Sequence, residues 1–326
     1  TSTPLPTDAS AVESTPDAAR RPLPRVPGMM NAVLIAVGLA GFLFFLSRAA
    51  SDGDDPSSAP GDPIAVRERP TPSSGDPPTT GTVEPPAAEP EALTVRIVAT
   101  FPHDARAFTQ GLEYHDGVLF EGTGIRRRST IRRVALETGE VLASADLPPE
   151  VFGEGISIVG EHVWQLSWVE GRAFHRNLAD FSVEREVTYE GEGWGLCHDG
   201  ARLVMSDGSD HLFFRDPTTF AVTGSIAVTL RGEPLEQLNE LECVDGLIYA
   251  NVWQTDHIAR IDPATGVVTG WIDTALHSGS PEGARLLPPD EAEHADVLNG
   301  IAWMPDRGHF LIGGKEWPHL FEVEFV

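Results

Sequence analysis

The sequence has little positive charge, and it lacks the motifs that usually mark catalytic metals and activated serines. Its 326 residues contain 23 Lys and Arg against 49 Asp and Glu, which gives a formal net charge of −26. Binding to a nucleic-acid backbone depends on clustered Lys and Arg, so we expect no nucleic-acid partner. The chain has no HExxH, paired CxxC or His-x-His pattern and no GxSxG elbow. These absences argue against metal catalysis and a serine nucleophile.

We therefore expect no cofactor and no metal among the site residues. The sequence leaves open a structural ion in a central channel, because backbone carbonyls would hold such an ion and no motif reports them.

Cysteine is also scarce, with only Cys197 and Cys243 in the whole chain. Either they form a disulfide, which an address outside the cytoplasm would permit, or they are two small buried hydrophobic residues. A disulfide needs Cα atoms about 4.4–6.8 Å apart. The sequence does not decide between these alternatives.

Long stretches of helical period are missing after residue 93, where Gly and Pro are scattered throughout. Five segments instead share one pattern: a polar or aromatic residue, usually Gly next, an alternating apolar stretch, and a turn signal that is Asp-Gly three times. This pattern is typical of the start of a β-hairpin. The five segments open at Gln110, Glu154, Trp194, Asn239 and Asn299.

A second set of residues follows each opening at a nearly constant distance. Fourteen residues after the first four openings, and sixteen after the fifth, are Gly124, Trp168, Gly208, Trp253 and Lys315. Because an antiparallel hairpin returns to the edge it left, both sets are expected on the same rim of a small pore. The repetition therefore predicts a binding site at that rim.

The spacing of the repeats predicts the architecture. The openings are roughly 40–60 residues apart, which is the period of four-stranded propeller blades. A second hairpin signal recurs in residues 135–141, 177–183, 216–222 and 262–268. The fifth unit supplies only three strands, so we expect residues 93–100 to close the ring as its fourth strand. The sequence thus predicts an all-β, five-bladed β-propeller of four-stranded antiparallel blades, and a β-sandwich would not explain the equal spacing.

The first 92 residues do not resemble a globular domain. We divide the chain into a disordered cytoplasmic tail (1–28), a transmembrane anchor or signal segment (29–47), a linker rich in Pro, Ser, Gly and Asp (48–92) and the propeller (93–326).

Residues 29–46 are uncharged and apolar and are just long enough to span a bilayer. Arg residues precede them, which places the propeller outside the cytoplasm. An uncleaved single-pass anchor in the cell envelope is favoured, because the apolar run exceeds a usual signal-peptide core. If the segment is cleaved, the protein is secreted or periplasmic.

The rim residues suggest acid-base chemistry. Glu154 lies between Trp168 and Trp194 in the predicted ring, and poor solvation there would raise the pKa of its carboxyl toward neutrality. Gln110 and Asn239 can donate and accept hydrogen bonds, whereas we expect Asn299 to fix neighbouring loops. Three tryptophans at equivalent rim positions favour a wall of the site over ordinary packing.

In these stretches the chain closely resembles the plant-type and bacterial glutaminyl-peptide cyclotransferases, also called glutamine cyclotransferases. The matching stretches are residues 102–112, 152–156, 192–196, 238–242, 251–256, 297–303 and 314–318. The resemblance implies a five-bladed propeller that converts the N-terminal Gln of peptides or proteins to pyroglutamate and releases ammonia. It also implies nine site residues, seven of which the repeats already indicate: Phe108, Gln110, Phe152, Glu154, Trp168, Trp194, Asn239, Trp253 and Lys315.

The implied mechanism is attack of the α-amine on the side-chain amide, with Glu154 as general acid and base. Gln110, Asn239 and Lys315 would position the amine or polarise the amide oxygen, in an order that the sequence leaves open. Peptides with N-terminal Gln are the expected partners, and we expect a monomer. The alternatives are a non-catalytic propeller that binds peptides or an envelope protein, and a metal-dependent, lactonase-like propeller.

Overall fold

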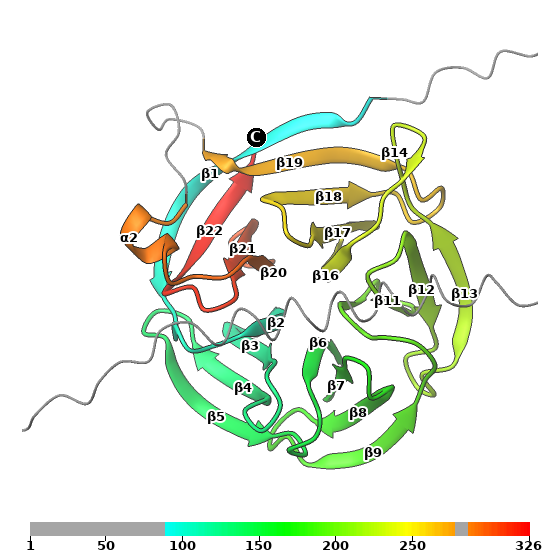
Figure 1. Ribbon diagram of the computed structural model, residues 1–326. Coiled ribbons are helices and arrows are strands. Elements are labelled where there is room, and N and C mark those ends of the chain that lie inside the picture. Colours follow the sequence, from blue (N-terminus) through cyan, green and yellow to red (C-terminus); the bar gives the residue numbers. More distant parts are fainter. Residues whose placement is uncertain (1–88, 278–285) are drawn as a thin grey trace, which may run out of the picture. The chain divides into compact units, whose positions relative to one another are not determined.

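A computed structural model describes residues 89–277 and 286–326 of the chain (Figure 1). Within these residues nearly all regular structure is β-strand, and the one α-helix is the four-residue α2 (Pro289–Ala292). The predicted all-β class is therefore confirmed. The predicted tail, the anchor and the linker up to residue 88 lie outside the described residues. In the two described ranges, no helix is long and apolar enough to cross a membrane.

Three sheets each contain four antiparallel strands that follow one another in chain order. The first consists of β2 (Thr109–His115), β3 (Val118–Thr123), β4 (Thr130–Ala135) and β5 (Glu140–Asp146). The second consists of β6 (Gly153–Val159), β7 (His162–Ser167), β8 (Arg172–Asn177) and β9 (Val183–Thr188). The third consists of β10 (Leu196–His198), β11 (Leu203–Ser206), β12 (His211–Arg215) and β13 (Val222–Ala227).

A larger sheet has eight strands in the order β16-β17-β18-β19-β1-β22-β21-β20. Its strands are β16 (Leu238–Val244), β17 (Leu247–Val252), β18 (His257–Ile261), β19 (Val268–His277), β1 (Glu91–Pro102), β22 (His319–Phe325), β21 (His309–Gly314) and β20 (Leu298–Met304). A separate two-stranded ribbon is formed by β14 (Thr229–Leu230) and β15 (Glu233–Pro234).

Strand β1 connects the two halves of the eight-stranded sheet. From Val95 to Pro102 it pairs antiparallel with β22, as predicted for the strand missing from the last repeat. Its first residues pair in parallel with β19, so the strand starts at Glu91, inside the segment that we predicted as linker. The strand thus begins two residues before the predicted boundary at residue 93, because the pairing with β19 has no local signal in the sequence.

The turn residues explain the hairpins that the repeats predict. Between β2 and β3, Asp116 and Gly117 have φ angles of 49° and 81°, and between β16 and β17, Asp245 and Gly246 have φ angles of 50° and 77°. Two consecutive positive φ angles define the type I′ turn, whose twist matches that of the flanking strands and which favours Asp-Gly. These dipeptides therefore fix the register of the inner strands.

Hydrophobic clusters lie between neighbouring sheets. The first sheet packs against the second, the second against the third, the third against β16–β19, and β16–β19 against β20–β22. A further cluster joins β20–β22 to the first sheet, where Leu112 and Leu119 meet Met304 and Leu311. In Figure 1 the strands β2, β6, β16 and β20 lie nearest the centre, and β5, β9 and β13 lie outside.

Buried carboxylates link the inner strands. Glu240 on β16 accepts hydrogen bonds from the backbone N–H of Leu112 (3.1 Å) on β2 and of Ile301 (2.7 Å) on β20. Glu242 accepts one from Trp303 (3.0 Å), and burial raises the pKa of its carboxyl to about 8. Buried backbone donors need such partners, so these carboxylates hold sheets together.

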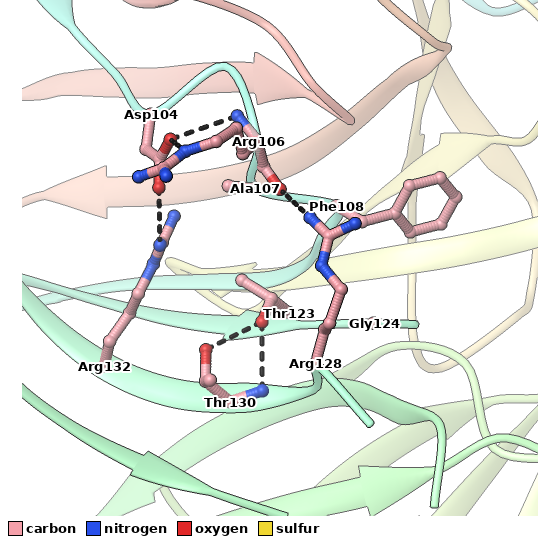
Figure 2. A pocket seen from close by; sticks show the side chains of 9 residues that line it. All are labelled: Asp104, Arg106, Ala107, Phe108, Thr123, Gly124, Arg128, Thr130 and Arg132. Carbon is pink, nitrogen blue, oxygen red and sulfur yellow. Dashed lines mark hydrogen bonds and ion pairs between the residues drawn. The ribbon is translucent and has the colours of Figure 1, made fainter. Parts of the chain in front are cut away.

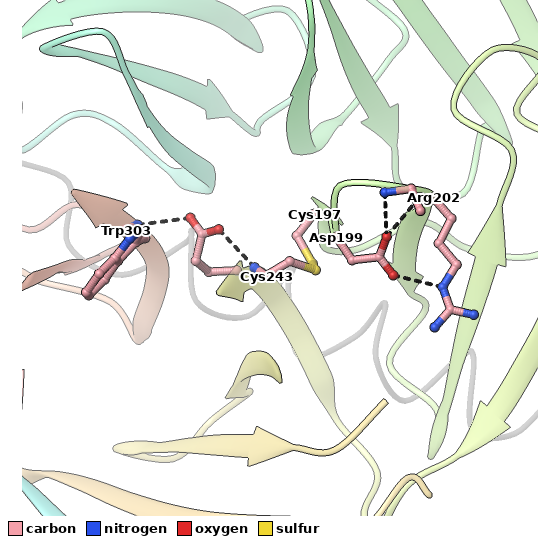
Figure 3. The surroundings of a disulfide bond; sticks show 7 residues. Cys197, Asp199, Arg202, Cys243 and Trp303 are labelled. Atoms are coloured by element: carbon pink, nitrogen blue, oxygen red, sulfur yellow. Dashed lines mark hydrogen bonds and ion pairs between the residues drawn. A yellow bond between two sulfur atoms is a disulfide. The ribbon is translucent and has the colours of Figure 1, made fainter. Parts of the chain in front are cut away.

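A disulfide joins two of these inner strands. Cys197 on β10 and Cys243 on β16 are bonded, with Cα atoms 5.5 Å apart and a separation of 46 positions in the sequence (Figure 3). The sequence left the pairing open because the two strands belong to different sheets. Their proximity depends on the packing of the third sheet against β16–β19.

Candidate active site

The predicted rim residues occupy equivalent places in the fold. Four of the five opening residues are the second residue of an inner strand, and Trp194 lies just before β10. These four are Gln110 in β2, Glu154 in β6, Asn239 in β16 and Asn299 in β20.

The second set lies where the neighbouring strands end. Gly124, Trp168, Trp253 and Lys315 come directly after β3, β7, β17 and β21, and Gly208 comes two residues after β11. Each hairpin therefore returns its second residue to the edge from which the first one starts, as predicted.

Three of the polar rim residues form a hydrogen-bonded chain. Gln110 Nε2 donates to Glu154 Oε1 at 2.9 Å, and Asn299 Nδ2 donates to Gln110 Oε1 at 3.1 Å. Asn299 also donates to the backbone carbonyl of Thr109 (3.0 Å), the first residue of β2, so the group that it fixes lies in a strand and not in a loop. Since its oxygen is held by Asn299, the Gln110 amide must point its nitrogen at Glu154.

Glu154 and Lys315 are both almost completely buried, with 4% and 5% of their surfaces exposed. Burial raises the pKa of the Glu154 carboxyl well above its usual range; the nearby carboxylates of Glu192 and Glu170 add to this, and Lys315 opposes it. Burial lowers the pKa of Lys315, and Glu154 partly offsets that effect. The pair thus offers a proton acceptor and a proton donor whose pKa values are shifted toward neutrality.

An aromatic wall surrounds these polar groups. The ring centroids of Phe108 and Phe152 are 6.0 Å apart, and those of Phe152 and Trp168 are 5.7 Å apart. Trp194 and Trp253 form an edge-to-face pair at 5.5 Å. The three tryptophans are partly exposed, unlike Trp164 in the core. Their exposure favours a wall that contacts ligands over a packing role.

Phe108 is an aromatic residue that contacts a polar group of the site. The Lys315 ammonium lies over the Phe108 ring, 5.0 Å from its centroid. Eight of the nine predicted site residues thus each contact another of them, and Asn239 is the exception among these contacts.

Glu192 is a site residue that the repeat pattern did not single out. Its Oε2 accepts hydrogen bonds from the indole N–H groups of Trp168 (2.6 Å) and Trp194 (2.9 Å). One carboxylate oxygen thus orients two walls of the site. The sequence could have indicated Glu192 in one way: it lies two residues before Trp194, in a stretch that resembles the glutamine cyclotransferases.

Asn239 carries a buried acceptor without a partner. The residue is 3% exposed, and within the described part of the chain its Oδ1 has no hydrogen-bond partner. Its backbone carbonyl accepts from Ser206 Oγ at 2.6 Å, which fixes the strand end. A buried unpaired acceptor is costly, so a ligand N–H at this position would relieve the cost.

A cavity of about 290 Å³ borders the wall at Phe108 and Gly124. Figure 2 shows that the Asp104 carboxylate, which also lines the cavity, accepts hydrogen bonds from the side chains of Arg106 (3.0 Å) and Arg132 (3.2 Å). These ion pairs engage Asp104, Arg106 and Arg132, whereas Arg128 donates to the backbone carbonyl of Arg106 (3.2 Å). The cavity leaves space beside Phe108.

Comparison with known proteins identifies a family for this chain. The model of the glutamine cyclotransferase family matches residues 76–325. A glutaminyl-peptide cyclotransferase of Arabidopsis thaliana is 39% identical over 232 residues, 71% of each chain. The crystal structure of Myxococcus xanthus glutaminyl cyclase superposes with a TM-score of 0.64 at 41% identity, and the match covers 73% of this chain and 98% of that one.

Proposed function

The chain belongs to the glutamine cyclotransferase family, and from this premise we propose that it converts the N-terminal Gln of peptides or proteins to pyroglutamate. The observation that carries the proposal is the placement of Glu154. A buried carboxyl with a raised pKa is hydrogen-bonded to Gln110, lies near the Lys315 charge, and is bordered by an aromatic wall. An acid-base group with these properties suits a proton transfer that must run in both directions.

The reaction is an intramolecular acyl transfer. The neutral α-amine of the substrate attacks the carbon of its own side-chain amide, so that a C–N bond forms and closes a five-membered ring. The bond from that carbon to the amide nitrogen then breaks, and the nitrogen leaves as ammonia. Glu154 takes a proton from the attacking amine and gives one to the leaving nitrogen, so no external acid or base is consumed.

The remaining polar groups hold the substrate in its folded, reactive shape. Asn239 Oδ1, which needs a donor, accepts a hydrogen bond from the α-amine. Lys315 and Gln110 stabilise the charge that develops on the amide oxygen. The wall of Phe108, Phe152 and the three tryptophans excludes water and lowers the entropy cost of ring closure.

We further infer that the sheets form a five-bladed propeller. Three blades are the four-stranded sheets, and β16–β19 is a fourth. The fifth consists of β20–β22 with β1, whose antiparallel pairing with β22 supports closure of the ring. The cluster that joins β20–β22 to the first sheet supports the same closure. A small-angle scattering curve that fits an open array of sheets and not a closed ring would contradict this inference.

The direct test is to incubate the purified full chain with a Gln-initiated dipeptide. We expect ammonia release together with a product lighter by one ammonia, and no reaction with the matching dipeptide in which Asn replaces Gln. A folded protein that binds the dipeptide without releasing ammonia would instead indicate a peptide-binding propeller. Ester hydrolysis that a chelator abolishes would indicate the lactonase-like alternative.

The pH dependence of catalysis should report the coupling of Glu154 to Lys315. Glu154 must be ionised to accept the proton, so activity is lost as the pH falls through its raised pKa. Lys315 lowers the pKa of Glu154, and the Lys315→Met variant should therefore move the acidic limb of kcat/KM upward by about 1–3 pH units. Arg133→Met, which removes a cation outside the site, is the control. An unmoved limb in Lys315→Met would contradict the coupling.

Adding a methyl group at Gly124 should disturb the wall without touching the polar groups. A Cβ atom there would lie 2.4 Å from the Phe152 ring and 3.1 Å from the Phe108 ring. Gly124→Ala should lower kcat/KM by about 10- to 100-fold, because small misplacements at a positioned substrate are costly. In the control Gly224→Ala the new Cβ makes an ordinary contact at 3.6 Å. Equal kcat/KM values in Gly124→Ala and Gly224→Ala would contradict the role of Phe108 and Phe152 in positioning the substrate.

The membrane anchor at residues 29–46, the extracytoplasmic address, the monomeric state and the absence of a cofactor stay proposals that rest on the sequence. The apolar run and the preceding Arg residues support the anchor. Release of the protein from membranes without detergent would contradict it.

A further inference from the structure

Two histidines and a glutamate meet on neighbouring strands of the second sheet, away from the candidate active site. His162 on β7, His175 on β8 and Glu184 on β9 each offer one ligand atom, and the three atoms lie within 4.8 Å of one another. His162 Nε2 is 3.0 Å and His175 Nδ1 is 3.7 Å from the same oxygen of Glu184, Oε2. The sequence showed no metal motif because these ligands come from three separate strands.

The register of the sheet explains how they come together. His175 pairs with Trp164 across β7 and with Arg185 across β9. Between His175 and Arg176 the register of β8 against β9 shifts, so Glu184 has no directly paired residue. Such an irregularity re-aims a side chain, and here it lets Glu184 reach both imidazoles.

We propose that His162, His175 and Glu184 form a binding site for a divalent transition-metal ion such as Zn²⁺, with water as the fourth ligand. In a tetrahedral site with bonds of about 2.0–2.2 Å, the ligand atoms are about 3.3–3.6 Å apart. The two measured separations, 3.0 and 3.7 Å, lie on either side of this range. Imidazole ligands favour zinc, copper or nickel over calcium and magnesium, which prefer oxygen.

The surroundings support metal binding. Asn177 Nδ2 donates to the other carboxylate oxygen of Glu184, Oε1, at 3.5 Å and so orients it. The His175 ring packs edge-on against the buried Trp164 with centroids 4.7 Å apart.

Arg185 is the nearby cation that could oppose a metal ion. Its guanidinium donates to the carbonyl of Thr218 and lies over the Trp164 ring, 5.2 Å from the centroid. These two contacts keep the Arg185 guanidinium against the Trp164 ring. The partial exposure of His162 and Glu184, 36% and 42% of their side chains, gives an ion access from solvent.

The test is equilibrium dialysis of the chelator-treated full chain against ZnCl₂, with bound zinc measured by mass spectrometry. We expect about one tightly bound zinc per chain and a dissociation constant at least about tenfold higher in His162→Ala and Glu184→Gln. His211→Ala is the matched control, because His211 is also partly exposed and contacts a single carboxylate, Asp210, at 2.7 Å. It should bind zinc like the wild type.

A second readout identifies the ligands directly. With Cu²⁺ as the probe, electron paramagnetic resonance of the wild type should show coupling to two imidazole nitrogens, and His162→Ala should show one. Ammonia release should be the same in wild type and His162→Ala, because none of the three ligands belongs to the candidate active site. Absence of stoichiometric zinc binding, or equal weakening in His211→Ala, would overturn the proposal.

Discussion

Replacing Glu154 with Gln is expected to lower kcat by about 10²- to 10⁴-fold, the range usual for loss of an acid-base group. The amide is nearly isosteric and can still accept the hydrogen bond from Gln110, so the substrate should bind with a similar KM. The variant should also fold, because an uncharged side chain suits a position that is 4% exposed. Ammonia release under single-turnover conditions measures the effect on the chemical step.

Glu161→Gln is the matched control for this experiment. Glu161 lies in the exposed turn between β6 and β7 of the same sheet, so the same substitution is made there away from the rim. Near wild-type kcat in Glu154→Gln would remove Glu154 from the mechanism. A thermal midpoint far below that of the control would instead mean that the loss comes from unfolding.

The second large effect is expected on stability. Changing both Cys197 and Cys243 to Ala should lower the free energy of unfolding by about 2–4 kcal/mol, because the disulfide joins residues 46 positions apart and restricts the unfolded chain. Denaturant unfolding followed by tryptophan fluorescence measures the difference. Activity at low temperature should persist, since neither cysteine lies on the rim.

A reducing agent separates the bond from the side chains. Reduction should destabilise the wild type by nearly the same amount and leave the double variant unchanged. If the variant is as stable as the oxidised wild type, the bond adds nothing and packing of the third sheet against β16–β19 is enough to hold the two strands together.

The rim of the site was predictable because it is built by repetition. The opening residues and the residues at the ends of the second strands recur at fixed intervals, and strand alternation converts these intervals into equivalent positions. The Asp-Gly turns also predicted the register in which the two strands of a hairpin pair. Phe108 and Phe152 each lie two residues before an opening residue, at a position that the predicted pattern did not include, so only resemblance to a family indicated them.

Contacts between different sheets were not predictable in the same way. Glu192 was not among the positions that the repeats singled out, yet it binds two tryptophans from different hairpins. The parallel pairing of β1 with β19 joins strands that are distant in the sequence. The meeting of His162, His175 and Glu184 depends on a register shift that leaves no local trace in the sequence.

The amino-acid sequence by itself determined the all-β class, the hairpin repeats and the identity of the rim residues, because these follow from local periodicity and turn chemistry. Only the tertiary structure decided the disulfide, the pKa shifts of Glu154 and Lys315, and the hydrogen bonds that orient Gln110 and the tryptophans. Those properties depend on distances and burial, which arise when sheets from distant parts of the chain pack together.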